Sequence, residues 1–347
     1  GDGALSLATD PPDATVRVSR LVRRDRRLVP ELDGPTVSPP LVELTVSRGD
    51  YLIELSHPDR HPLRYPVRVG RLTHWDGVPP GAVTAPPIRL AQQAELADDE
   101  VLVPGGWFVA GGDPGAPTAL EPLRCWVDAF VISRRPVTNA EWLAFVDDLS
   151  AGAHAAQALA HVPANLPDDP YHWTPDLPVR RVPWASALAY AAWWAAKRGQ
   201  AWRLPSEVEW EKAARGVDGR VLPWGDYLDP AWCAMRDSSR GVPVSAYSFA
   251  EDESPYGVLG MAGNVRDWCL EGAAEGPLID ALGRLVLPDP AVGDPRVARV
   301  ARGGAYDDPA RACRAAARHA VAPERRRDNV GVRLVRPYPP CSPTDVL

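Results

Sequence analysis

Cysteine and histidine are the residues of this chain whose chemistry suits metal binding or redox catalysis. The five cysteines are spread along the chain with no C-x-x-C pair: Cys125, Cys233, Cys269, Cys313 and Cys341. This spacing argues against a zinc knuckle and a disulfide-dense secreted scaffold, and it favours buried thiols in a reducing cytoplasm. Among the seven histidines only His57 and His61 are four positions apart, and Pro58 disfavours a helix presenting both to one metal ion.

The usual sequence signatures of catalysis are missing. No nucleophile elbow G-x-S-x-G, no Walker A loop and no strand followed by G-x-G-x-x-G occurs. Adjacent acids such as Asp147 and Asp148 are explained by solvation at the surface rather than by acid-base catalysis. The sequence motifs therefore indicate no catalytic centre.

Composition places the chain among globular proteins that do not bind nucleic acid. Its 347 residues carry 38 basic and 45 acidic side chains, which leave a formal charge of -7 with no block of like charge. Because neutralising phosphates requires a basic face, no nucleic-acid partner is expected. The sequence has no run of about 18 apolar residues and no signal-peptide layout, so it predicts no membrane segment.

Three helices are predicted to position any site in the second part of the chain. Capping boxes that start at Thr138 (T-N-A-E) and Ser206 (S-E-V-E) each open a helix, and Gly216 ends the second of these. The segment 185–198, rich in alanine and tryptophan, forms a third helix, which Gly199 ends.

A change of composition near residue 95 divides the chain into two predicted domains, 1–95 and 96–347. Residues 3–90 alternate in polarity over several short stretches separated by turn residues, which predicts a small all-β sandwich. Residues 71–99 are rich in proline and acids and have little to bury, so they are predicted to be a linker that a protease cuts first. The later part, with its helices and many short strands, is predicted to be α+β.

The N-terminal stretch resembles the PEGA-type β-domain. The matching elements are Pro11 to Ala14, Pro40-Leu41 and Gly49 to Tyr51, each beside a predicted strand. The resemblance implies a spacer or docking role. Because such domains are found attached to bacterial serine/threonine kinases, it also allows a regulatory part of a bacterial signalling system.

Six ordered strings between residues 100 and 337 resemble the formylglycine-generating enzyme, or sulfatase-modifying factor, family. They are VPGGWF, FVISRRPVTNAEWLAFV, LPVRRVPWASALAYAAWWAAKRG, RLPSEVEWEKAARG, SPYGVLGMAGNVRDW and RVARGGAYDDPARACRAAARH. The resemblance implies a C-type-lectin-like α+β fold. It does not fix the activity, because that fold carries copper oxidases, iron oxidases and non-catalytic binding proteins.

In the copper-dependent members of that family two cysteines, five residues apart, bind copper(I). The matching positions here are Asp308 and Cys313. Copper(I) is a soft ion that prefers thiolates, so a carboxylate at one position is expected to abolish tight binding. Cys313 is then predicted to be a buried structural thiol.

Two further metals are implied by relatives. The sulfoxide synthases hold iron with three histidines and a helical domain; this chain has neither that histidine pattern nor such a domain, so no iron site is expected. Family members also hold structural calcium at a Gly-Asn-x-x-Glu stretch, here Gly263 to Asp267, with Asn264 and Asp267 as candidate ligands. Because aspartate is shorter than glutamate, the alternative is that Asp267 pairs with an arginine and binds no metal.

The function favoured by the sequence is recognition of a protein or another macromolecule by a non-catalytic lectin-like domain. The predicted ligand-binding face lies between residues 306 and 328, where relatives diversified by retroelements vary their sequence. It consists of Tyr306, Asp307, Asp308, Arg311, His319, Arg325 and Arg326. Aromatic and arginine side chains are typical of protein interfaces, and the segment has few apolar side chains for a core, so its members are expected to be exposed. The alternative is a metal-dependent oxidase with an atypical site.

Overall fold

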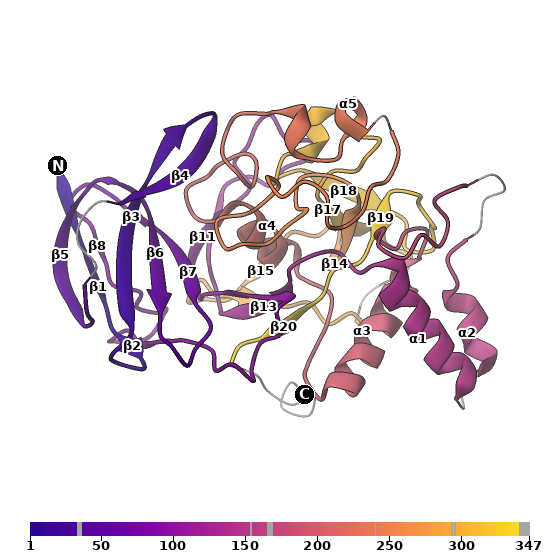
Figure 1. The fold of residues 1–347 in the computed structure, drawn as a ribbon, viewed down its shortest axis with the longest axis horizontal. Coiled ribbons are helices and arrows are strands. Elements are labelled where there is room, and N and C mark those ends of the chain that lie inside the picture. Colours follow the sequence, from indigo (N-terminus) through magenta and orange to yellow (C-terminus); the bar gives the residue numbers. More distant parts are fainter. Residues whose placement is uncertain are drawn as a thin grey trace.

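The computed structural model describes residues 1–32, 37–152, 155–164, 169–239, 241–292, 294 and 296–339. An all-β N-terminal part lies at one end of the molecule and three helices lie at the opposite end, with short strands and loops between them (Figure 1). The predictions of an all-β N-terminal part and of an α+β fold for the rest are confirmed.

Two sheets form the N-terminal part. Their strands are β1 (Asp2–Leu7), β3 (Thr15–Arg24), β4 (Arg27–Leu32), β5 (Leu41–Ser47), β6 (Gly49–Ser56), β7 (Leu63–Val69) and β8 (His74–Trp75). One sheet has the order β5-β1-β8 and the other β4-β3-β6-β7. Val16 of β3 and Val67 of β7 are buried in one cluster with Leu5 of β1, because alternate side chains of a strand point to the same face.

The second part is built from short strands around one four-stranded sheet. This sheet has the order β18-β17-β14-β19, and a three-stranded sheet has the order β10-β13-β20. The strands are β10 (Glu100–Val103), β11 (Gly106–Ala110), β12 (Leu123–Val127), β13 (Phe130–Ser133), β14 (Arg266–Gly272), β15 (Leu278–Ile279), β16 (Leu285–Val286), β17 (Arg299–Arg302), β18 (Arg318–Val321), β19 (Val330–Gly331) and β20 (Val335–Pro337). A further parallel pair, β2 (Thr9–Asp10) and β9 (Ile88–Arg89), attaches the end of the predicted linker to the N-terminal part.

All three predicted helices are present, among five α-helices and two 3₁₀ helices in the described residues. The predicted helices are α1 (Asn139–Ala151), α3 (Trp184–Arg198) and α4 (Glu207–Arg215). The others are α2 (Ala155–His161), α5 (Arg236–Ser239), and the 3₁₀ helices η1 (Pro230–Trp232) and η2 (Ala310–Cys313). Both capping boxes form, since Thr138 and Ser206 accept hydrogen bonds from the backbone three residues later. Gly199 ends α3 with φ 64°, a left-handed conformation that glycine adopts readily.

The predicted linker 71–99 is not a loosely held connection. It contributes β8 and β9, and Leu90 and Ala91 near its end are fully buried, whereas no side chain of residues 71–87 is buried, as expected for a segment with little to bury. The proline-rich composition hid these few apolar positions. Preferential cleavage therefore stays a prediction for residues 71–87, and the buried Leu90 and Ala91 are expected to resist it.

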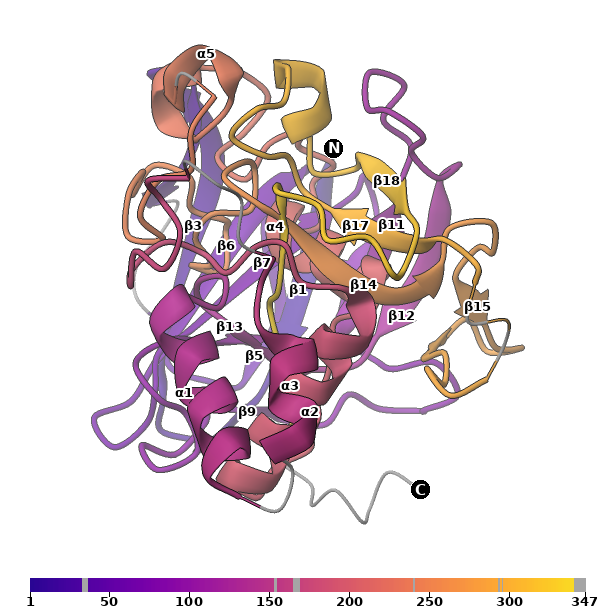
Figure 2. The same cartoon turned by 90° about the vertical axis from the view of Figure 1, so that its right-hand side faces the viewer.

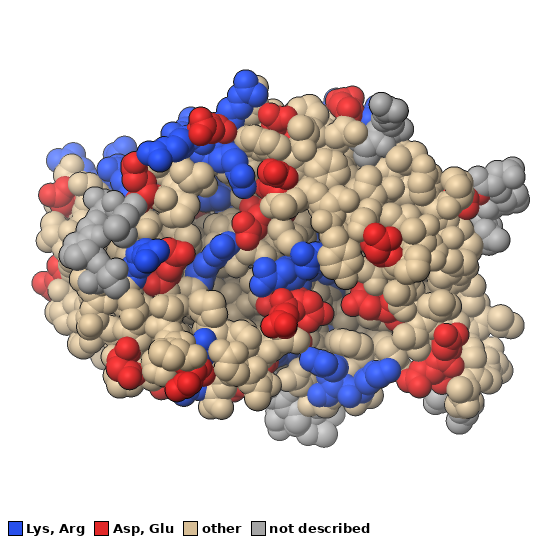
Figure 3. All heavy atoms as spheres, in the orientation of Figure 1, with Lys and Arg blue, Asp and Glu red and all other residues tan. Residues whose placement is uncertain are grey.

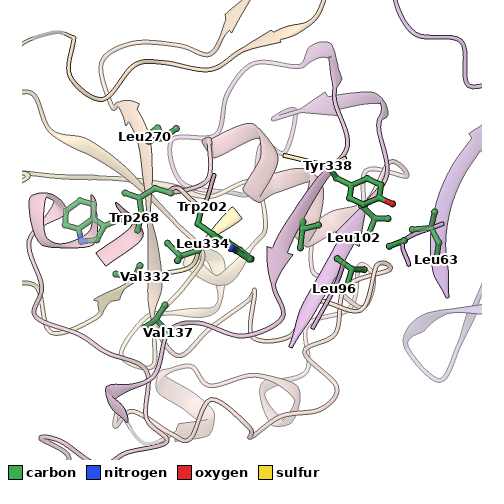
Figure 4. Close-up of a cluster of buried hydrophobic side chains, with 14 of the residues drawn as sticks. Leu63, Leu96, Leu102, Val137, Trp202, Trp268, Leu270, Val332, Leu334 and Tyr338 are labelled. Carbon is green, nitrogen blue, oxygen red and sulfur yellow. The ribbon is translucent and has the colours of Figure 1, made fainter. Parts of the chain in front are cut away.

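One apolar core runs through both parts of the molecule. Leu63 of β7 and Leu102 of β10 belong to the same buried cluster as Trp268 of β14. Figure 4 shows Leu63, Leu102 and Tyr338 close together, with Trp268 farther along the cluster. The hydroxyl of Tyr65 donates to the carbonyl of Gly105, and backbone Leu28 donates to Trp224 at 2.8 Å. Apolar packing and hydrogen bonds therefore join the N-terminal sheets to the rest.

Within the described residues, none of the helices combines the length and the apolar composition needed to span a bilayer. The longest, α3, has 15 residues.

Candidate functional site

The loop between β17 and β18 carries four of the seven residues of the predicted face, and its two ends rest on buried ion pairs. Arg302, the last residue of β17, donates to Glu211 of α4 at 2.5 Å, and Arg318, the first residue of β18, donates to Glu207 at 2.5 Å. Arg302 and both glutamates are at most 1% exposed. β17 lies between β18 and β14 in the sheet, close to α4 (Figure 2). The ends of the loop are thus fixed to the core.

Asp308 occupies the position where copper-dependent relatives carry a thiolate, and it is an ion-pair partner. Its carboxylate accepts a hydrogen bond from Arg266 of β14 at 2.5 Å and another from the backbone of Ala305 at 2.9 Å. Burial raises the pKa of the Asp308 carboxyl, against the opposing charge of Arg266. An acceptor already engaged by a guanidinium is a poor ligand for a soft cation, so Asp308 and Cys313 do not fit a copper(I) pair.

Cys313 is fully buried, as predicted, and it has a thiol neighbour that the sequence did not reveal. Cys233 lies in the same apolar cluster, which also holds Met235 and Trp224. A hydrogen bond to Cys313, together with burial, raises the pKa of the Cys233 thiol well above its usual value. Two buried thiols in apolar surroundings are typical of a core position.

Tyr306 and Asp308 are buried, contrary to the prediction that they form an exposed face. Tyr306 is 4% exposed, and its hydroxyl donates to the carboxylate of Asp328 at 2.8 Å, which Arg181 also contacts at 2.6 Å. The segment also fills the core with small side chains: Ala312, Cys313, Ala315, Ala316 and Ala317 are buried. Small apolar residues were underestimated because each covers little area, although together they pack closely.

The other members of the predicted face are more accessible. Arg311 and Arg325 are exposed, and Asp307 is half-buried with its carboxylate bonded to Asn329 at 2.9 Å. Arg326 is exposed but donates to the carbonyls of Ala160 and Val162 at 2.7 Å each. Arg326 therefore holds the end of α2, and the groups left for a partner are the exposed Arg311 and Arg325 and the half-buried Asp307.

His319 is a partly buried histidine of β18 that stays neutral over most of the acid range. Its ring nitrogen Nε2 is buried and has no hydrogen-bond partner within the described residues. Burial, and then the positive charge of Arg266, lowers the pKa of His319 to about 3. A neutral imidazole in this place supports packing of the loop, whereas protonation would place a cation beside Arg266.

Replacing His319 with glutamine is expected to reduce the loss of stability in acid. The unfolded chain binds a proton on this histidine below about pH 6.5, whereas the folded chain binds one only below about pH 3. As the pH falls through this window, the free energy of unfolding therefore decreases by up to about 1.4 kcal/mol per pH unit. Urea unfolding at pH 7, 6, 5 and 4 should show the wild type losing free energy of unfolding faster than H319Q. Parallel curves for the two proteins would contradict this assignment.

The predicted calcium stretch is engaged by protein groups. The carboxylate of Asp267 accepts hydrogen bonds from Arg333 and from the indole of Trp210, both at 2.9 Å. The side chain of Asn264 donates to the carbonyl of Val244 at 2.8 Å and accepts from its backbone nitrogen at 3.2 Å. The ion pair with Arg333 agrees with the alternative prediction, in which Asp267 pairs with an arginine.

The remaining histidines and cysteines do not converge. In the described part of the chain there is no group of three or more histidine, cysteine, aspartate or glutamate side chains that could hold a metal ion. His57 faces Asp13 at 3.5 Å, whereas His61 contacts the carbonyl of Gln93 at 3.2 Å. His154 and Cys341 lie outside the described residues.

Comparison with known proteins identifies the region that carries this loop. A family model described as the sulfatase-modifying factor enzyme 1-like domain matches residues 88–338. A formylglycine-generating enzyme of Streptomyces coelicolor is 31% identical over 67% of this chain and 88% of its own length. A hercynine oxygenase of Mycolicibacterium smegmatis is 36% identical over 50% of this chain but only 45% of its own length. An inactive Cα-formylglycine-generating enzyme 2 of Bos taurus is 32% identical over 48% of this chain and 69% of its own length.

Among solved structures, PvdO from Pseudomonas aeruginosa covers 70% of this chain and 96% of its own, with a TM-score of 0.55 and 24% identity. This likeness concerns the fold, and it confirms the C-type-lectin-like architecture expected for the second part. The N-terminal sheets precede the matched region, so their resemblance to a PEGA-type domain stays a prediction. Since the family model spans residues 88–338, the chain belongs to the sulfatase-modifying factor, or formylglycine-generating enzyme, family.

Proposed function

We propose that this protein is a non-catalytic recognition module built on the sulfatase-modifying factor fold. The observation that carries the proposal is the ion pair of Asp308 with Arg266, at the position where copper-dependent relatives need a thiolate. The pair fixes a hard, engaged carboxylate where copper(I) chemistry requires a soft ligand. The family includes members named as enzymes and a member named as inactive, so loss of activity is compatible with the fold.

The proposed partner is a protein or another macromolecule, bound through the accessible groups that remain in the segment 306–328, which comprises the loop between β17 and β18, β18 itself and the residues after it. Arg311 and Arg325 are exposed and can offer planar guanidinium donors, and Asp307 adds a carboxylate. Both ends of the loop are held by buried ion pairs, so little conformational freedom is lost when a partner docks.

A metal-dependent oxidase with an atypical site is the second candidate. The observation that favours it is the contact between Cys233 and Cys313, which brings two sulfur ligands together although Asp308 has replaced the usual second cysteine. Their complete burial weighs against it, because a substrate would need access to the metal.

One experiment with two arms tests the proposal. In the first arm, purified protein is titrated with copper(I) against a chelator and incubated with a cysteine-containing peptide substrate, with the Streptomyces coelicolor formylglycine-generating enzyme as positive control. We expect neither stoichiometric copper(I) nor peptide oxidation. Copper binding that Cys233→Ser abolishes, accompanied by oxidation of the peptide, would establish the oxidase instead.

In the second arm, wild-type protein and an Arg311→Ala/Arg325→Ala variant are used to capture partners from an extract of the source organism. A partner bound through Arg311 and Arg325 should be retained by the wild type and depleted with the variant, because arginine anchors contribute strongly to interfaces, on the order of 2 kcal/mol each when central. Both side chains are exposed, so the variant should melt as the wild type does. Equal capture by both proteins would contradict binding of the partner through Arg311 and Arg325.

A further inference from the structure

A polar cleft lies at the junction of the N-terminal sheets and the second part, away from the loop between β17 and β18. It has a volume of about 450 Å³, within the range of small-molecule sites. Residues from the ends of β3, β6 and β7 form one wall, and β10 with residues 134, 256 and 257 forms the other. The surface is hollowed between the two parts, with basic side chains on both sides of the hollow (Figure 3).

Three arginines line this cleft. Arg17 belongs to β3, Arg64 to β7, and Arg134 follows β13. Arg64 forms an ion pair with Glu253 at 2.9 Å. Within the described residues, the guanidinium groups of Arg17 and Arg134 make neither an ion pair nor a hydrogen bond, and Nε of Arg134 is buried without an acceptor. A buried donor without a partner loses its water and gains nothing in return.

The carboxylates of the cleft do not supply the missing acceptors. Glu100 already contacts Arg336 at 2.8 Å and Arg198 at 3.5 Å. Glu54 lies opposite both Arg17 and Arg64 in the sheet but forms no ion pair with either in the described structure. The lining therefore holds two unpaired guanidinium groups against one unpaired carboxylate, which leaves a positive excess.

We propose that this cleft binds a small molecule through a phosphate group, held between Arg17 on one wall and Arg134 on the other. A tetrahedral phosphate presents oxygens in several directions, so two guanidinium groups that approach from opposite walls can each donate to it. The hydroxyls of Thr15 and Ser56, which also line the cleft, are further donors for the rest of the ligand. The buried Nε of Arg134 then gains its acceptor.

Such a ligand would connect the two parts of the molecule. Arg17 belongs to the N-terminal sheets and Arg134 to the second part, so a phosphate that contacts both adds an ionic link beside the shared core. Binding to the folded state alone must raise the melting temperature as ligand is added. The site is independent of the proposed recognition loop, so either can fail without the other.

Calorimetric titration of the whole chain at low ionic strength tests the site. Inorganic phosphate and phosphomonoesters such as glucose 6-phosphate and phosphoserine are the probes, and glucose and serine are the controls. We expect one binding site, with affinity reduced about tenfold or more in both Arg17→Gln and Arg134→Gln, since each loses a charged hydrogen bond. Stronger binding of an ester than of inorganic phosphate identifies an organic phosphate as the occupant; equal binding identifies the free ion.

Arg135→Gln is the matched control, because Arg135 adjoins Arg134 but stacks on Tyr247 at 4.7 Å, outside the lining of this cleft. It should bind every probe as the wild type does. Arg134→Lys keeps the positive charge but not the planar guanidinium group, so it should bind with intermediate affinity. This result would show that weak binding by Arg134→Gln does not come from a folding defect. The proposal is overturned if no phosphate probe binds, if glucose or serine binds as well as its phosphate ester, or if Arg135→Gln weakens binding as much as Arg134→Gln.

Discussion

Replacing Arg302 with alanine is expected to destabilise the protein by about 3 to 5 kcal/mol, because it removes one partner from a fully buried ion pair. Its guanidinium donates to Glu211 and to the carbonyls of Ala315 and Ala316, and the side chain has no exposed surface. The substitution leaves these acceptors short of a donor inside the core. Urea unfolding at neutral pH measures the loss, and thermal unfolding of a chain of 347 residues should show a drop of about 1 to 2 °C per kcal/mol.

Arg311→Ala is the control for this prediction, since Arg311 belongs to the same loop but is exposed. Its stability should stay within about 0.5 kcal/mol of the wild type. Arg302→Met fills a similar volume without charge and should restore little, because Glu211 then lacks this partner although Arg215 still contacts it at 2.8 Å. If Arg302→Ala unfolds at the same urea concentration as Arg311→Ala, the ion pair does not stabilise the loop.

Trp268→Ala is expected to cost about 3 to 5 kcal/mol by leaving a cavity in the shared core. Trp268 has no exposed surface, and its indole donates to the carbonyl of Val182 at 3.1 Å. Its neighbours along the cluster come from several elements, so the gap cannot be filled by one local movement (Figure 4). The free energy of unfolding measured by urea, with fluorescence and circular dichroism as separate probes, reports the loss.

Two variants separate the causes. Trp268→Phe keeps an aromatic ring but loses the donor to Val182, so it should cost less than the alanine variant. Trp173→Ala removes a half-buried indole that belongs to no buried apolar cluster of the described residues and should change stability little. An alanine variant at position 268 that is as stable as Trp173→Ala would show that the core does not depend on this side chain.

Features set by neighbouring residues could be predicted from the sequence. The capping boxes at Thr138 and Ser206 involve partners three residues away, and Gly199 ends α3 through its own backbone freedom. The alternating strands of the N-terminal part were visible for the same reason. β4 contains Pro30, and it lies at the edge of its sheet, where a missing backbone donor is tolerated.

Features that depend on distant residues could not be predicted. Arg266 and Asp308 are 42 positions apart, and the thiol neighbour of Cys313 comes from a segment far earlier in the chain. The sequence therefore showed that position 308 lacks a thiolate, but it did not show that the carboxylate there pairs with Arg266. Tyr306 was expected at an interface because of its residue type, whereas its hydroxyl partner Asp328 makes it a core residue.

The shared core has a consequence for how partners are presented. A flexible connection between two binding parts lets a ligand at one end search a volume set by the connecting chain. Here apolar side chains from β7 and β10 belong to one continuous cluster, so the N-terminal sheets cannot swivel freely against the second part. Groups attached to the two ends of the molecule are therefore held at a fixed spacing and in a fixed orientation.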